Sequence, residues 1–145
     1  MQYDPKFILA LLQPIRQKKT DVVYGTRINR LPNFRGEEKT MQFLIHYLGN
    51  RFLSFVTSIL YGQWITDMET GYKLFPRMAI NHSELTSQGF SIEPELTARL
   101  LKQGYQIHEI AITTKPRGYK DGKKLQTWRD GWSALFTLIK HRMIL

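Results

Sequence analysis

The sequence contains no cysteine, which excludes a disulfide framework and any metal site built on thiolates. It also lacks a long uninterrupted hydrophobic run. The most apolar region, residues 41–65, is interrupted by His46, Asn50, Arg51 and Gln63, whereas a membrane-spanning helix needs about 20 mainly apolar residues. The sequence therefore predicts no transmembrane span. No positively charged stretch leads into an apolar segment at the N-terminus, so we also expect no signal peptide.

Acidic residues are scarce as well. The 145 residues include 12 Asp and Glu against 21 Lys and Arg, which gives a formal net charge of +9. Such an excess favours an anionic partner, which can be nucleic acid, a phosphorylated small molecule or an acidic membrane surface. The hydrophobic content of 42%, with 12% aromatic residues, indicates one folded domain rather than disorder.

Apolar periodicity and turn residues predict alternating helices and strands, the pattern of an α/β fold. The first helix has Asp4 as its N-cap and Pro5 at its first position. Residues 41–61 carry one or two helices, and a break between two helices would fall at residues 49–50. The first helix ends near residue 18. The predicted strands are at 21–25, 71–75 and 105–112, and loops are expected at 28–40 and 114–124. The other predicted helices are a short one opened by Pro76, one at 94–103 stopped by Gly104, and a C-terminal helix.

Two carboxylates, Asp67 and Glu69, stand two residues apart immediately before the strand at 71–75. On an extended stretch, residues i and i+2 point the same way, so these two side chains would address one site. A polar loop in which Asp67 caps a turn is the alternative interpretation.

Arginines occur where a phosphate group could be bound. Arg27 follows the carboxyl end of the strand at 21–25, the place where open α/β sheets bind ligands, and Arg117 lies in the basic loop at 114–124. The planar guanidinium fork matches phosphate oxygens. A solvated basic loop is the alternative for Arg117.

Four stretches resemble, in order and spacing, family-2 glycosyltransferases of the GT-A fold, the family that includes dolichol-phosphate mannose synthases. Residues 66–75 resemble the family signature Thr-Asp-x-x-Thr-Gly-Tyr-Lys-Leu-Phe. Residues 2–5 resemble those that directly follow its metal-binding Asp-x-Asp, and residues 21–27 resemble its Asp-Val-Val-x-Gly-Thr-Arg strand. The fourth stretch, residues 90–110, resembles a Phe-x-x-Glu-x-Glu run followed by Gly-Tyr and Glu-Ile.

The resemblance implies an α/β fold of the GT-A (Rossmann-like) type whose N-terminal nucleotide-binding part is missing. Residues 1–145 would form the acceptor-side half of that domain, with amphipathic interface helices at about 37–61 and 125–145. The implied enzyme is a hexosyltransferase that moves a sugar, with inversion, from a nucleotide-diphosphate sugar to polyprenyl (dolichyl or undecaprenyl) phosphate. It would be peripheral to the cytoplasmic face of a membrane. We expect this chain alone to be inactive, because the nucleotide-binding residues are not in it.

The resemblance also assigns roles to individual residues. Catalysis falls to Asp67 and Glu69, acceptor-phosphate binding to Arg27, Arg117 and Arg35, the donor side or scaffold to Glu93 and Lys73, and a Mg²⁺ or Mn²⁺ site of the complete enzyme to Gln2.

Two other functions stay open. The chain can be a non-catalytic, membrane-peripheral fragment that binds lipid phosphate. A basic nucleic-acid-binding module agrees with the charge, but no recognisable motif supports it, so we expect no nucleic-acid partner.

Overall fold

Strand β1 (Val22–Thr26) is the centre of a mixed three-stranded sheet with the order β2-β1-β3. It pairs antiparallel with β2 (Lys73–Leu74) and parallel with β3 (Ile107–Ala111). All five residues of β1 are buried, as expected for a strand covered on both faces. The computed structural model describes residues 4–28, 41–81, 85–113 and 127–144.

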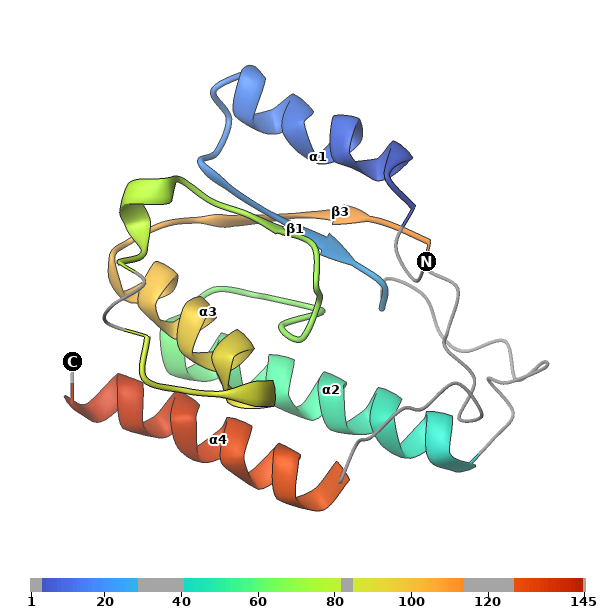
Figure 1. Ribbon diagram of the computed structural model, residues 1–145, viewed down its shortest axis with the longest axis vertical. Helices are drawn as coiled ribbons and strands as arrows, with labels where there is room; N and C mark the ends of the chain where they lie inside the picture. The colour runs from blue at the N-terminus through green and yellow to red at the C-terminus, as the bar shows by residue number, and fades with distance from the viewer. Residues whose placement is uncertain (1–3, 29–40, 82–84, 114–126, 145) are drawn as a thin grey trace.

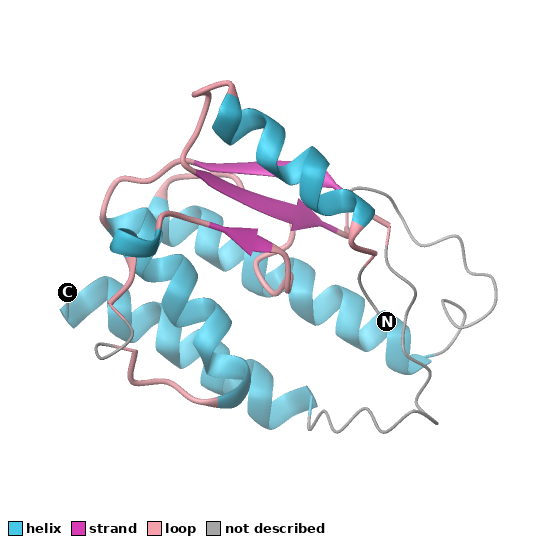
Figure 2. Cartoon of the chain, turned by 45° about the horizontal axis from the view of Figure 1, so that its top comes forward, coloured by secondary structure: helices cyan, strands magenta, loops and turns pink. Residues whose placement is uncertain are grey.

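Helices cover both faces of this sheet (Figures 1 and 2). Helix α1 (Lys6–Arg16) lies on one face, against β1. On the other face, α2 (Met41–Tyr61), α3 (Ile92–Lys102) and α4 (Thr127–Ile144) pack together. The described residues thus form a small α/β domain, which confirms the predicted fold class at this level.

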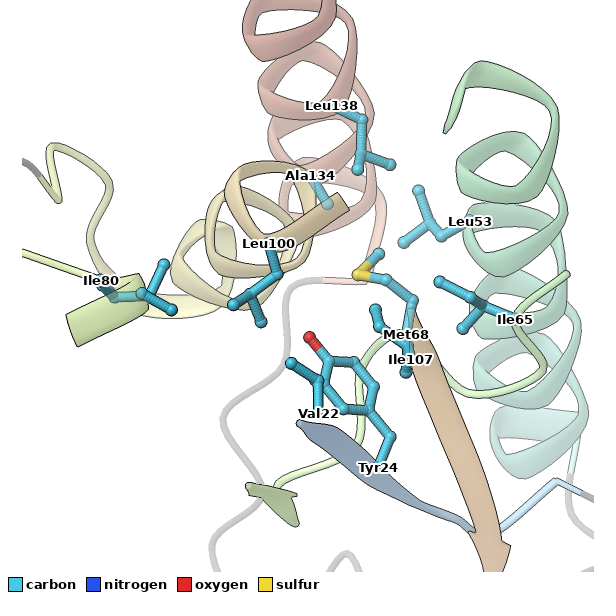
Figure 3. Close-up of a cluster of buried hydrophobic side chains, with 11 residues drawn as sticks. Val22, Tyr24, Leu53, Ile65, Met68, Ile80, Leu100, Ile107, Ala134 and Leu138 are labelled. Carbon is cyan, nitrogen blue, oxygen red and sulfur yellow. The ribbon is translucent and has the colours of Figure 1, made fainter. Parts of the chain in front are cut away.

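The hydrophobic core fills the space between the sheet and these three helices (Figure 3). Tyr24 of β1 is fully buried there, and its hydroxyl forms a hydrogen bond of 3.0 Å with Thr97 Oγ1 of α3. Burial raises the pKa of Tyr24, so the phenol stays neutral. Met68 reaches the same core from the segment before β2. The core therefore anchors the two segments that carry the candidate site residues.

A buried carboxylate ties α3 to the segment that precedes it. Glu95 accepts hydrogen bonds from the backbone N–H groups of Thr86 and Ser87 and from the guanidinium of Arg99. Burial alone would raise the pKa of Glu95, but these hydrogen bonds outweigh it and lower the pKa to about 2. The Glu95 carboxylate is therefore ionised. It lies at the contact of α3 with α4, where His141 Nε2 is 3.7 Å from Glu95 Oε1.

Most predicted elements are confirmed. Helix α1 begins at Lys6 with Pro5 at the N-cap position, one residue later than predicted, and Asp4 Oδ1 accepts a hydrogen bond from the Lys6 N–H. Gly104 follows α3 with φ of +84°, a conformation that L side chains rarely adopt, and it stops the helix as predicted. The strands at 21–25 and 105–112 agree with β1 and β3 to within two residues at each end.

Of the two alternatives for residues 41–61, the single helix is confirmed, since α2 continues without a break through Gly49 and Asn50. One prediction about element boundaries is wrong. The predicted strand at 71–75 shrinks to β2, because a turn at residues 68–69 and Pro76 leave little extended chain between them.

The expectation of no membrane span concerns helix α2. Within the described helices, Phe43–Tyr61 is long and apolar enough to cross a membrane by length and composition, and 22% of this stretch is buried.

Candidate functional site

The segment of residues 65–70 lies against the carboxyl end of β1. Thr66 Oγ1 forms a hydrogen bond of 2.7 Å with Thr26 Oγ1, and the Thr70 hydroxyl donates to the Gly25 carbonyl. Gly25 is required for this close approach, because a Cβ atom there would lie 3.1 Å from Tyr72 Cβ and 2.9 Å from a methyl group of Ile112. The segment that carries Asp67 and Glu69 therefore lies beside the last residues of β1, at the carboxyl end of this strand.

Asp67 and Arg27 form a bidentate ion pair at this edge. Arg27 Nε donates to Asp67 Oδ2 and Nη2 donates to Asp67 Oδ1, both over 2.8 Å, and the Arg27 backbone N–H also donates to Oδ2. The Asp67 side chain is fully buried, whereas that of Arg27 is 23% exposed. Burial would raise the pKa of Asp67, but Arg27 outweighs it and lowers the pKa, so the carboxylate is ionised.

Two further residues hold Asp67, one through its carboxylate and one through its backbone, and sequence reasoning gave neither of them a role. Asn50 Nδ2 of α2 donates to Asp67 Oδ1 over 2.8 Å. The Glu109 carboxylate of β3 accepts the backbone N–H groups of Thr66 and Asp67 over 2.9–3.0 Å. Glu109 stands in one of the stretches that resemble the family, but nothing in its spacing points to Asp67.

Glu69 occupies a half-buried position beside this pair. The two carboxylates are not on one extended stretch as predicted, because residues 68–69 form a turn, and Arg27 Nη2 contacts the Glu69 backbone carbonyl instead. Among the described residues, the buried Glu69 Oε1 has no hydrogen-bond partner. Burial, only partly offset by Lys73, raises the pKa of Glu69 to about 7.

Lys73 and Glu93 form a separate ion pair that joins β2 to α3. Lys73 Nζ contacts Glu93 Oε2, donates to the Thr70 carbonyl and lies 5.0 Å from the ring centroid of Tyr24. Burial lowers the pKa of Lys73, and Glu93 opposes this effect. The donor-side or scaffold role expected for Glu93 and Lys73 stays a prediction.

Three predicted site residues, Gln2, Arg35 and Arg117, lie outside the described residues. Within the described ranges, no group of three or more His, Cys, Asp or Glu residues could hold a metal ion.

Exposed apolar side chains form one stripe on α2 and another on α4, helices that pack together in the layer opposite α1 (Figure 1). Their spacing of three or four residues places each set on one side of its helix. The α2 stripe consists of Leu48, Phe52, Phe55 and Ile59, and the α4 stripe of Trp132, Phe136, Ile139 and Met143.

Comparisons with known proteins point to glycosyltransferases. The chain is 31% identical to glycosyltransferase AglJ of Haloferax volcanii over 60% of this chain and 29% of that protein. It is 26% identical to the low-salt glycan biosynthesis hexosyltransferase Agl6 of the same organism, over 90% of this chain and 30% of that protein. It is 28% identical to the UDP-N-acetylglucosamine–dolichyl-phosphate N-acetylglucosaminyltransferase of Methanococcus voltae, over 78% of this chain and 44% of that protein.

The chain spans less than half the length of each of these three relatives. No family model matches it, and no solved structure matches it at a significant level. The chain is a distant homologue of glycosyltransferases.

Proposed function

We propose that the complete protein is a family-2 glycosyltransferase of the GT-A fold that transfers a sugar from a nucleotide-diphosphate sugar to polyprenyl phosphate, with inversion. This chain would supply the acceptor side of the site. The relative from Methanococcus voltae is named for a dolichyl-phosphate acceptor and a UDP-sugar donor, and it matches 78% of this chain. The described residues bear on how the acceptor phosphate would be bound.

The observation that carries the proposal is the Arg27–Asp67 pair at the carboxyl end of β1. Asp67 binds Nε and Nη2 of Arg27, which fixes the plane of the guanidinium while leaving the side chain partly exposed. A preorganised cation at a sheet edge suits a phosphate oxyanion. In this proposal Arg27 contacts the acceptor phosphate, and Asp67 acts through Arg27 by orienting it.

Glu69 supplies a second feature expected of a reactive site. A carboxyl group whose pKa is about 7, buried beside charged neighbours, is typical of functional positions. A phosphate monoester has a second pKa of about 6, so the acceptor is largely dianionic near neutral pH and needs no strong general base. We assign Glu69 to balancing charge near the reacting groups rather than to activating the acceptor.

The two apolar stripes suit a protein that meets its acceptor at a lipid surface. Aromatic and aliphatic side chains on one side of a helix are typical of helices that lie in a membrane interface. We therefore propose a peripheral location on the cytoplasmic face of a membrane. A divalent cation, Mg²⁺ or Mn²⁺, stays an expectation for the complete enzyme, and no step of this proposal depends on it.

In the complete protein, Arg27→Ala should weaken the apparent affinity for polyprenyl phosphate roughly 10- to 100-fold, because one charge-assisted contact to a dianion is lost. Affinity for the sugar nucleotide should stay nearly unchanged. Arg27→Lys should restore only part of the affinity. The ammonium group keeps the positive charge but cannot bind two oxygens in one plane. We expect Arg117→Ala to give a similar loss. The measurement is KM for each substrate with protein whose folding is checked by circular dichroism.

An Arg27→Ala protein that stays folded, keeps its KM for polyprenyl phosphate and loses affinity for the sugar nucleotide would move Arg27 to the donor side.

A further inference from the structure

Helix α2 contributes Leu53 to the core, yet it also carries apolar side chains on its outward side. Its inward side carries buried Ser54, Thr57 and Ser58, whereas the α2 stripe of Leu48, Phe52, Phe55 and Ile59 is 50–65% exposed. A surface helix of a soluble protein usually turns its apolar side to the core. The outward side of α2 is thus suited to an apolar environment.

The inward side of α2 holds the segment that carries Asp67. Three side chains spaced four residues apart form hydrogen bonds with it. Asn50 Nδ2 donates to Asp67 Oδ1 over 2.8 Å, Ser54 Oγ accepts the Met68 N–H over 2.9 Å, and Ser58 Oγ accepts the Ile65 N–H over 3.0 Å.

The same segment also reaches the outward side. Trp64, which is 65% exposed, stands three residues before Asp67. With Phe52, Phe55 and Arg51 of α2, it lines a shallow hollow of about 290 Å³. A partner that covers Phe52 and Phe55 of the α2 stripe would therefore also meet Trp64.

The charge around the stripe favours an anionic lipid bilayer as the occupant. The sequence of α2 contains no Asp or Glu and one arginine, Arg51. The neighbouring helix α4 exposes Lys140 and Arg142 close to its own stripe. Aromatic rings with cations around them suit the headgroup region of a bilayer, where rings are half-buried and cations meet lipid phosphates.

We propose that Asn50 is a positioning residue that transmits bilayer contact at the α2 stripe and Trp64 to the Asp67 carboxylate. Docking would restrict the motion of α2 and of residues 64–68 together, and Asn50 would pass this restriction to the Arg27–Asp67 pair. A contact that orders one part of a network lowers the cost of ordering the rest. This inference rests on the proposed function, because a polyprenyl phosphate acceptor would be met at a bilayer.

Hydrogen exchange measured by mass spectrometry tests the proposal, because the Arg27 N–H donates to Asp67 Oδ2 and reports whether the carboxylate is in place. Exchange in residues 24–28 of the 145-residue chain is compared with and without phosphatidylcholine vesicles that contain phosphatidylglycerol. Binding should slow exchange at Arg27 at least roughly fivefold. Phosphatidylcholine vesicles alone should have a smaller effect, since they lack the anionic headgroups.

Three variants separate binding from transmission. Phe55→Ser combined with Ile59→Ser should abolish both vesicle binding and the slowing. Asn50→Ala should bind vesicles like the wild type and lose the slowing, and Asn50→Leu replaces it if the alanine variant does not fold. Ser58→Ala is the matched control, because it removes a contact from the same inward side without touching Asp67, and it should keep the slowing.

The proposal is overturned if Asn50→Ala keeps the slowing, or if the wild type binds vesicles without any change at Arg27. It is also overturned if the chain does not bind vesicles. This holds whether gel filtration shows a monomer or a dimer in which a second copy covers the α2 stripe. No sugar or acceptor is present in this experiment, so its failure is distinguishable from failure of the proposed transferase activity.

Discussion

Asp67→Asn should lower the free energy of unfolding by about 3–5 kcal/mol, because it removes one partner of a largely buried ion pair. The Arg27 guanidinium would keep its charge while losing the carboxylate that binds its Nε and Nη2 atoms. The asparagine amide would also direct N–H groups toward guanidinium or Asn50 donors. Urea denaturation of the wild type and the variant at neutral pH measures the difference.

Two comparisons make this result specific. Asp4→Asn removes the exposed Asp4–Lys6 pair and should change stability by at most about 0.5 kcal/mol. The double variant Arg27→Met with Asp67→Asn should lose less than the sum of the two single changes, since neither charge is then left alone. Additive losses, or an Asp67→Asn protein as stable as the wild type, would show that the pair contributes nothing to the fold.

Glu69→Gln should stabilise the protein by about 3 kcal/mol near pH 8 and have little effect near pH 4.5. The folded-state pKa of Glu69, about 7, lies above its ordinary value of 4.5. The folded state therefore holds the proton more tightly than the unfolded state does. The contribution of Glu69 is most favourable below pH 4.5 and is lost as the pH rises through 7. Glutamine stays neutral and avoids this loss.

The free energy of unfolding measured as a function of pH checks this expectation. Asp21→Asn, at an exposed acidic position, is the control and should leave the pH profile nearly unchanged. A Glu69→Gln protein that is less stable than the wild type at every pH would mean that the ionised carboxylate is favourably bound in the fold. A loss of transfer activity together with the gain in stability would match a functional position.

Sequence reasoning located the candidate site but not its internal contacts. It placed Arg27 past the end of a strand and Asp67 in a carboxylate pair, yet 40 positions separate them and no periodicity reports a contact across that distance. The pairing depends on how β2 returns beside β1, which the apolar pattern does not specify.

The sequence was also ambiguous about helix α2. Its apolar residues predicted a broad helical face suited to a core or to an interface, and the structure exposes four of them as the α2 stripe. Asn50 was interpreted as an interruption or a helix break, whereas it faces inward and binds Asp67. A polar residue within an apolar helix has this meaning only once the position of its partner is known.

The most direct test of the account is transfer of labelled sugar from a nucleotide-diphosphate sugar to polyprenyl phosphate by the complete protein in detergent or vesicles. The account predicts labelled lipid that depends on added polyprenyl phosphate, is greatly reduced by Arg27→Ala, and is absent when the 145-residue chain is assayed alone. Label transferred to a water-soluble or protein acceptor, with none in the lipid fraction, would contradict the proposed function.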